Sequence, residues 1–191
     1  MQLDDYTKSV LSDEKLLRSK LLIYFKKPEA IEYYAKTILL AFNAGKQENF
    51  DKVSDWSWWG FFYGWIFLWY RGSNVTGTFF GLGLVSVFLY FSASATQSFA
   101  LIFVLICFGL FILFHLSKYS KFYIVEKFID NLKLSNGDDA LLATYGKTNT
   151  FAFILGIILS PFVISEIIGY LLLPIIFIGG ILKAIMGLIA I

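Results

Sequence analysis

Residues 56–71 read WSWWGFFYGWIFLWYR, and this stretch divides the chain into two unlike parts. It holds all five tryptophans of the protein. The sequence before it is charged and typical of a soluble segment, whereas the sequence after it contains long uncharged apolar runs. Trp and Tyr favour the headgroup level of a bilayer, where an apolar ring lies beside a hydrated donor. We therefore predict that the chain meets the membrane at this stretch.

The composition predicts a membrane protein. The 191-residue chain is 58% hydrophobic and only 16% charged, and its mean hydropathy is +0.69. Soluble domains average about 45–50% apolar and about 25% charged residues. Transmembrane β-strands alternate apolar and polar residues over about 10 positions, but these runs are apolar on every face. The expected fold is all-α and polytopic, with about four transmembrane helices.

The N-terminal segment, residues 1–55, is expected to hold small cytosolic helices. We expect residues 1–11 to be frayed, and the first helix to begin at Ser12, whose hydroxyl would cap it. That helix should stop before Pro28, which suits the first turn of a second helix ending near Ala44. Two interpretations of these helices stay open. Either they form a cap that packs on itself, or their apolar faces lie on the membrane surface.

The aromatic stretch itself, residues 56–71, is too short to cross a core about 30 Å thick. We predict a short interfacial or re-entrant helix there. Gly60 and Gly64 are four residues apart, so one helix face is flat and permits close packing against a neighbouring helix. The side chains expected to anchor it at the interface are Trp56, Trp58, Trp59, Trp65, Trp69, Tyr70 and Arg71.

The remaining apolar runs predict two transmembrane hairpins. The first hairpin occupies residues 72–116, with spans at 75–91 and 99–116. Its second helix should continue into water, because apolar positions keep helical spacing through the basic segment 117–150. Within that segment, Asp138 is expected to cap a short helix. The second hairpin occupies residues 151–191, with Pro174 as the expected break.

Basic residues set the predicted topology. Basic residues are concentrated in the N-terminal segment and in the 117–150 segment, whereas the linker 92–98 has no charge. The positive-inside rule places the basic segments, and the N-terminus, in the cytoplasm. The three lysines expected to contact lipid headgroups are Lys118, Lys121 and Lys127. The alternative is that these lysines serve only to set the topology.

A motif in the aromatic stretch resembles a known family. The family's motif is Trp-aromatic-Phe-Phe-x-Gly followed by Trp-x-x-Tyr-Arg. The residues of this chain that resemble it are Trp58, Phe61-Phe62-Tyr63-Gly64, Trp65, Leu68 and Tyr70-Arg71. With the two spans and the segment Asp138-Asp139…Gly146, it resembles a bacterial family of small inner-membrane proteins catalogued as a domain of unknown function. The resemblance covers about residues 22–150. Trp59-Gly60 and Gly72 depart from the family pattern. The resemblance implies a bacterial inner membrane and no particular reaction.

Few residues suggest a catalytic, metal-binding or ion-conducting role. Glu166 is the sole acid within the long apolar runs. If the chain turns near Pro174, we expect the long side chain of Lys183 in the facing helix to reach it. Ionisable groups inside a membrane are functional hypotheses by default. An ion pathway and a protonated, hydrogen-bonded Glu166 both remain open. His115 lies at a membrane edge with no second ligand nearby, and Cys107 has no adjacent base, so neither predicts a metal site or a nucleophile.

These observations favour a non-enzymatic protein of the bacterial inner membrane. Zinc spacings, phosphate-binding loops and nucleophile elbows are absent from the sequence, so we expect no cofactor and no metal. The expected partners are membrane lipid and either another membrane protein or a second copy of the chain. The net charge of +2 gives no reason to expect nucleic acid. The alternative function is a small oligomeric transporter or ion-conducting protein that uses Glu166.

Overall fold

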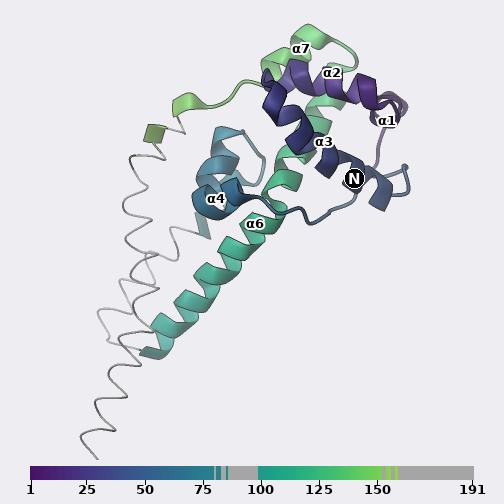
Figure 1. The fold of residues 1–191 in the computed structure, drawn as a ribbon. Helices are drawn as coiled ribbons and strands as arrows, with labels where there is room; N and C mark the ends of the chain where they lie inside the picture. Colours follow the sequence, from purple (N-terminus) through teal and green to yellow (C-terminus); the bar gives the residue numbers. More distant parts are fainter. Residues whose placement is uncertain (80, 83–84, 86–98, 152–153, 156–157, 159–191) are drawn as a thin grey trace, which may run out of the picture. The chain divides into compact units, whose positions relative to one another are not determined.

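The computed structural model describes residues 1–79, 81–82, 85, 99–151, 154–155 and 158 (Figure 1). Contacts divide the chain into two compact units, Met1–Phe153 and Ile154–Ile191, and every element named below belongs to the first. The described ranges contain helices and no β-strand, which confirms the all-α prediction for this part of the chain. The helices are α1 (Asp5–Ser12), α2 (Glu14–Phe25), α3 (Pro28–Ala44), α4 (Trp58–Tyr70), α6 (Phe99–Ser135) and α7 (Asp139–Tyr145).

The chain begins with an ordered helix, α1. The Asp4 carboxylate accepts a hydrogen bond from the Thr7 backbone N–H at 2.7 Å and so caps the first turn. Val10 and Leu11 at the far end of the helix are fully buried in the core. The prediction that residues 1–11 are frayed is therefore wrong, because two apolar side chains dock this short helix onto its neighbours.

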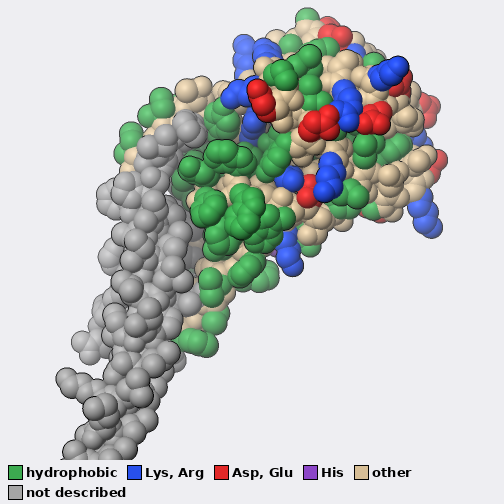
Figure 2. Space-filling view, in the orientation of Figure 1, with side chains coloured by type: hydrophobic (Ala, Val, Ile, Leu, Met, Phe, Trp, Pro, Cys, Tyr) green, Lys and Arg blue, Asp and Glu red, His purple; other side chains and the backbone are tan. Residues whose placement is uncertain are grey.

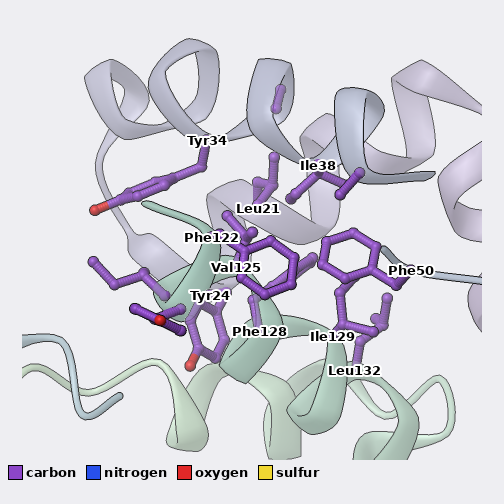
Figure 3. Close-up of a cluster of buried hydrophobic side chains, with 14 of the residues drawn as sticks. Leu21, Tyr24, Tyr34, Ile38, Phe50, Phe122, Val125, Phe128, Ile129 and Leu132 are labelled. Carbon is purple, nitrogen blue, oxygen red and sulfur yellow. The ribbon is translucent and has the colours of Figure 1, made fainter. Parts of the chain in front are cut away.

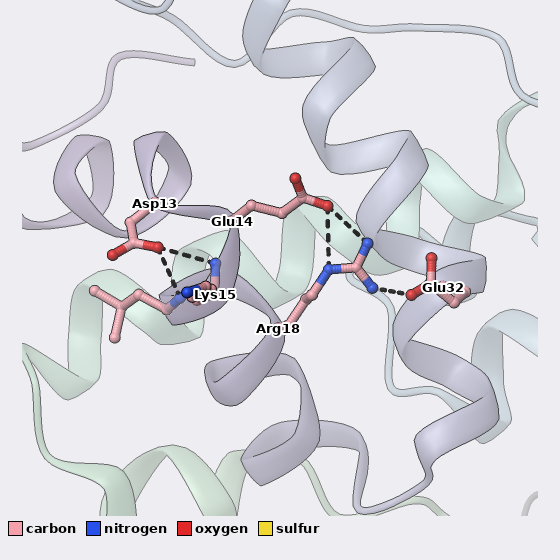
Figure 4. Close-up of polar contacts among 6 residues, drawn as sticks. Asp13, Glu14, Lys15, Arg18 and Glu32 are labelled. Atoms are coloured by element: carbon pink, nitrogen blue, oxygen red, sulfur yellow. Dashed lines mark hydrogen bonds and ion pairs between the residues drawn. The ribbon is translucent and has the colours of Figure 1, made fainter.

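Helix α2 is capped by Asp13 and not by Ser12. Asp13 accepts hydrogen bonds from the backbone N–H groups of Lys15 at 2.9 Å and Leu16 at 3.2 Å (Figure 4). The Ser12 hydroxyl instead donates to the carbonyl of Lys8, in the last turn of α1. The predicted start of the helix is thus off by one residue, since an aspartate and a serine compete for the same capping position.

Helix α3 starts and ends as the sequence predicts. Pro28 occupies its first turn and Gly45 follows its last residue, Ala44. A side chain at Gly45 would lie 2.0 Å from the carbonyl oxygen of Asn49, so only glycine fits the turn that follows. Arg18 of α2 pairs with Glu32 of α3 and with Glu14, 2.7 Å away in its own helix (Figure 4). These pairs are exposed, and they contribute little to stability.

Helix α6 is one continuous helix of 37 residues, about 55 Å long at 1.5 Å per residue. Within the described residues, only its portion Phe103–Ser135 is long and apolar enough to cross a membrane. The continuation of this helix beyond residue 116 is confirmed. The predicted spans 151–173 and 174–191 lie largely or wholly outside the described residues, as does most of 75–91. The four-span arrangement therefore stays a prediction.

The core of the unit forms around the C-terminal half of α6. Val125, Phe128, Ile129 and Leu132 are completely buried there, and the inner faces of α2 and α3 pack against them (Figure 3). The Phe128 ring centroid lies 5.2 Å from that of Tyr24. The N-terminal helices therefore neither pack only on themselves nor turn their apolar faces to a bilayer. They form, with this half of α6, a single cap.

Helix α7 closes the cap against α2. Its N-terminal capping residue is Asp138, as the sequence predicts. The Lys20 Nζ atom lies 2.5 Å from Oδ1 of Asp139 in its first turn. At its other end, a side chain at Gly146 would lie 1.8 Å from the carbonyl oxygen of Tyr24. Glycine thus permits a contact between the end of α7 and the end of α2 that no other residue allows.

Candidate membrane-interface site

Helix α4, which carries the aromatic stretch, is fixed at its start by the buried residue Ser57. The Ser57 hydroxyl accepts a hydrogen bond from the backbone N–H of Gly60 at 3.0 Å. Its own N–H donates to the carbonyl of Ser117 in α6 at 2.7 Å. The hydroxyls of Ser57 and Tyr33 share a third hydrogen bond, 2.7 Å long. One serine therefore joins α4 to both α6 and α3.

The close packing expected at Gly60 is found against α6. A Cβ atom at Gly60 would lie 2.2 Å from Oγ of Ser120 and 2.6 Å from the carbonyl oxygen of Leu116. Gly64, one turn later, has φ +48° and ψ −124°, so α4 consists of two helical pieces joined at a kink. This conformation is costly for any residue with a side chain. The two glycines thus have different roles, close approach at Gly60 and a bend at Gly64.

The first piece of α4 presents aromatic side chains to the surface. Trp58 is 62% exposed and Phe62 is 67% exposed, and their rings stack with centroids 5.9 Å apart. Trp59 and Tyr63 are also exposed, and their rings stack at 5.3 Å. In Figure 2, hydrophobic side chains gather on the part of the molecule that holds α4, whereas charged side chains lie over the helices of the cap. Exposed apolar surface of this kind marks an interaction site.

The predicted anchor residues differ in exposure. Trp56 is exposed like Trp58 and Trp59, but Trp65, Trp69 and Tyr70 are half-buried. The rings of Trp65 and Trp69 stack on each other with centroids 5.8 Å apart. The exposed face of the aromatic helix is therefore made mainly by its first piece, together with Trp56 in the preceding loop.

Arg71, the last of the predicted anchors, does not reach into solvent from the end of α4. Its guanidinium carbon lies 5.2 Å from the ring centroid of Phe25, 5.7 Å from that of Tyr34 and 5.3 Å from that of Tyr70. Burial raises the pKa of the Tyr34 hydroxyl well above its ordinary value, even though the nearby Arg71 lowers it. Tyr34 therefore stays neutral and does not balance the charge. Sequence reasoning missed this arrangement, because nothing in the spacing pairs the first turns of α3 with the end of α4.

The three lysines expected at headgroups lie in different environments. Lys118 is exposed and Lys127 is half-buried, so both ammonium groups remain near the surface. Lys121 is only 8% exposed, and its Nζ atom lies 2.9 Å from Oδ2 of Asp55 and 4.2 Å from the ring centroid of Tyr33. The expectation of a headgroup contact for Lys121 is corrected accordingly, because this lysine is engaged inside the protein.

His115 belongs to a small polar cluster where the apolar half of α6 ends. Its Nε2 atom lies 2.7 Å from the hydroxyl oxygen of Tyr123, which also accepts a hydrogen bond from Lys52 at 2.8 Å. The Lys52 ammonium lies 4.3 Å from the ring centroid of Tyr119. These contacts give His115 a packing role beside the loop that holds Lys52. Over the residues that the structure covers, no three His, Cys, Asp or Glu side chains gather into a metal site.

Glu166 and Lys183, the predicted intramembrane pair, lie outside the described residues, so their proximity stays a prediction. Cys107 is exposed on the apolar half of α6. No family model matches the chain, and no curated protein or solved structure does so either. The family resemblance of the aromatic motif accordingly also stays a prediction.

Proposed function

We propose that this chain is a non-enzymatic protein of the bacterial inner membrane that holds a helical cap at the cytoplasmic surface of the bilayer. It acts there as a structural or accessory subunit that binds membrane lipid. The helices of the apolar runs cross the membrane more than once, and the N-terminus and the 117–150 segment lie in the cytoplasm.

The observation that carries the proposal is the change in burial along α6. Phe103 is 67% exposed and Phe111 is 66% exposed in the first half of the helix, whereas Phe128 in the second half is fully buried by the cap. Leaving large apolar side chains in water is unfavourable by about 25 cal/mol per Å². A bilayer around the first half removes this cost, and the cap removes it for the second half.

The aromatic helix supports the same position for the membrane surface. α4 packs on α6 at Gly60, beside Leu116 and Ser120, where α6 changes from exposed to buried. Its exposed tryptophans therefore lie at the level where the apolar half of α6 ends. This is the headgroup level at which tryptophan is enriched in membrane proteins.

Fluorescence quenching tests the proposal directly, because every tryptophan lies between residues 56 and 69. The full-length protein is reconstituted into vesicles whose lipids carry bromine at chosen depths. We expect the strongest quenching from bromine close to the glycerol end of the acyl chains. Equal quenching by a water-soluble quencher with and without vesicles, and none by any brominated lipid, would show that α4 does not meet the bilayer.

Cysteine labelling tests the topology. Cys107 is first replaced by serine, and single cysteines are then introduced by Ala95→Cys and Asn136→Cys. A membrane-impermeant reagent applied to intact cells is expected to label position 95 only, and position 136 after permeabilisation. Labelling of both positions from outside contradicts the predicted orientation. A pull-down of the full chain in mild detergent then distinguishes an accessory subunit, which retains a protein partner, from a lipid-binding protein.

A further inference from the structure

A pocket of about 470 Å³ opens between the first turns of α3 and the kinked helix α4. Its lining includes Arg71, the half-buried residue that follows the last residue of α4. Its rim carries Lys27 and Glu29, which are both exposed. The rest of its lining is aromatic or apolar: Ala30, Tyr33, Tyr34, Trp59, Tyr63, Ile66, Phe67 and Tyr70.

The guanidinium of Arg71 has unused donors. Its Nε and Nη1 atoms are buried, and neither has a hydrogen-bond partner among the described residues. The ion pairs within that part of the chain include none to Arg71. An arginine keeps its charge at any physiological pH, and a buried charge without a partner is unfavourable. Cation–π contacts with the surrounding rings and a side-chain hydrogen bond to the Tyr34 hydroxyl offset part of this cost, but Nε and Nη1 stay without an acceptor.

The charge and shape of the pocket select an anion. Arg71 and Lys27 carry two positive charges and Glu29 one negative charge, which leaves the pocket one positive charge in excess. An aromatic cage can bind a cationic ligand, but here the rings of Phe25, Tyr34 and Tyr70 already hold the guanidinium. The planar fork of arginine matches the paired oxygens of a phosphate group. A singly charged phosphodiester therefore balances the excess charge of the pocket.

The position of the pocket indicates the source of the phosphodiester. Trp59 and Tyr63, in the wall of the pocket, belong to the exposed aromatic face of α4. We propose that the Arg71 pocket binds the phosphodiester of an anionic phospholipid, with the phosphate on Arg71 and Lys27 and the glycerol and first acyl carbons along Trp59, Ile66 and Phe67. The choice of a lipid rests on the proposed function, whereas the choice of a phosphate rests on the pocket alone.

Binding is measured on the full chain in a nonionic detergent, by native mass spectrometry and by thermal unfolding. The probes are dioctanoyl phosphatidylglycerol, dioctanoyl phosphatidylcholine and inorganic phosphate. We expect saturable binding of one phosphatidylglycerol with a rise in the unfolding temperature. Replacement Arg71→Gln is expected to weaken it about tenfold or more, because it removes a charge-assisted hydrogen-bond pair.

Two variants at exposed positions test whether the pocket prefers a negatively charged ligand, without disturbing the core. Lys27→Gln removes a positive charge from the rim, so it should weaken phosphatidylglycerol binding by a few fold. Glu29→Gln removes the acid of the lining and should strengthen the binding. The matched control is Lys15→Gln, which removes an exposed positive charge from α2, outside the pocket, and should change nothing. Opposite effects of the Lys27 and Glu29 variants are expected whether or not Arg71→Gln folds.

Each contrary result overturns a defined part of the inference. Equal affinity of the wild type, Arg71→Gln and Lys27→Gln for phosphatidylglycerol would remove the pocket as the site. Equal binding of phosphatidylcholine would contradict the selection of an anionic headgroup. Inorganic phosphate that binds as well as the lipid would assign the pocket to a soluble phosphate compound. These outcomes are independent of tryptophan quenching in vesicles, so failure of the pocket and failure of the membrane position are distinguishable.

Discussion

The ammonium group of Lys121 and the carboxylate of Asp55 form a buried ion pair, with 2.9 Å between Nζ and Oδ2 across 66 residues of sequence. Asp55 also accepts a hydrogen bond from the Thr37 hydroxyl at 2.5 Å, and its backbone N–H donates to the carbonyl of Lys118. The loop before α4 is thereby fastened to α3 and to the middle of α6. Helix α4 starts three residues after Asp55, so this pair sets where the aromatic helix begins.

Replacement Asp55→Asn should destabilise the cap, because it leaves the Lys121 charge buried without its partner. We expect a loss of about 2–3 kcal/mol in the free energy of unfolding. The measurement is chemical unfolding of the full chain in nonionic detergent, followed by near-ultraviolet circular dichroism. The control is Glu48→Gln, since the pair of Glu48 with Lys8 is exposed and should contribute little to stability. Equal losses of unfolding free energy for the two variants would show that burial of the Asp55–Lys121 pair does not increase its contribution to stability.

Replacement Gly60→Ala should separate α4 from α6, because the added methyl group has no room beside Ser120 and Leu116. Overpacking of this kind costs about 1–3 kcal/mol. The tryptophan emission spectrum should shift as well, since α4 carries four of the five tryptophans. Gly77→Ala is the matched control, because a Cβ atom there meets no described atom within 4 Å. An unchanged spectrum and stability for Gly60→Ala would contradict the close contact.

Replacements on the two halves of α6 should have different effects. Phe128→Ala removes a fully buried ring from the cap, and should lower its unfolding free energy by about 3–5 kcal/mol. Phe111→Ala removes an exposed ring from the apolar half, so it should leave unfolding of the cap nearly unchanged. Similar effects of both changes on cap stability would contradict the division of α6 into an exposed apolar half and a half that is buried in the cap.

The cap should become less stable as the pH rises through the titration of Glu126. Burial, and then the neighbouring Asp130, raise the pKa of Glu126 above its ordinary value, against smaller opposite effects of Lys52 and the N-terminal amino group. The folded state therefore favours the protonated acid more than the unfolded state does. Below the unfolded pKa of about 4.3 both states are protonated and the group has no effect. Destabilisation develops above that pH and is complete once the pH exceeds the folded pKa.

Glu126→Gln tests this pH dependence. The variant should unfold at a higher temperature than the wild type at pH 7, and at about the same temperature near pH 4. Glu48→Gln again serves as the control, because it replaces an exposed glutamate. A difference between Glu126→Gln and the wild type that stays constant over this pH range would show that loss of charge is not the cause.

Local signals in the sequence predicted α3, α7 and the continuation of α6, but they missed α1 and placed the start of α2 one residue early. The ends of α3 followed from Pro28 and Gly45, and the cap of α7 followed from Asp138. The apolar spacing beyond residue 116 predicted the continuation of α6. Each of these signals acts over a few residues, within the reach of one helical turn.

Contacts between distant segments were not predictable in the same way. Lys121 is one of several lysines in a basic segment, and no local pattern indicates that its partner is Asp55. Arg71 was expected at the headgroup level, but its cage requires Phe25 and Tyr34 from two other helices. Such arrangements depend on how α2, α3 and α4 cross α6, which is decided by side-chain packing and not by periodicity.

Helix α6 provides both the apolar half and the surface that completes the core of the cap. The two halves are synthesised in a fixed order. Residues 1–57 leave the ribosome with Leu17, Leu21 and Ile38 uncovered, because the surface that buries these side chains includes Phe128, Ile129 and Leu132. The apolar half of α6 is made before that surface exists. The apolar half of α6 is therefore synthesised before the core of the cap can be completed. A folded cap therefore shows that synthesis has passed Leu132, beyond the apolar half of α6.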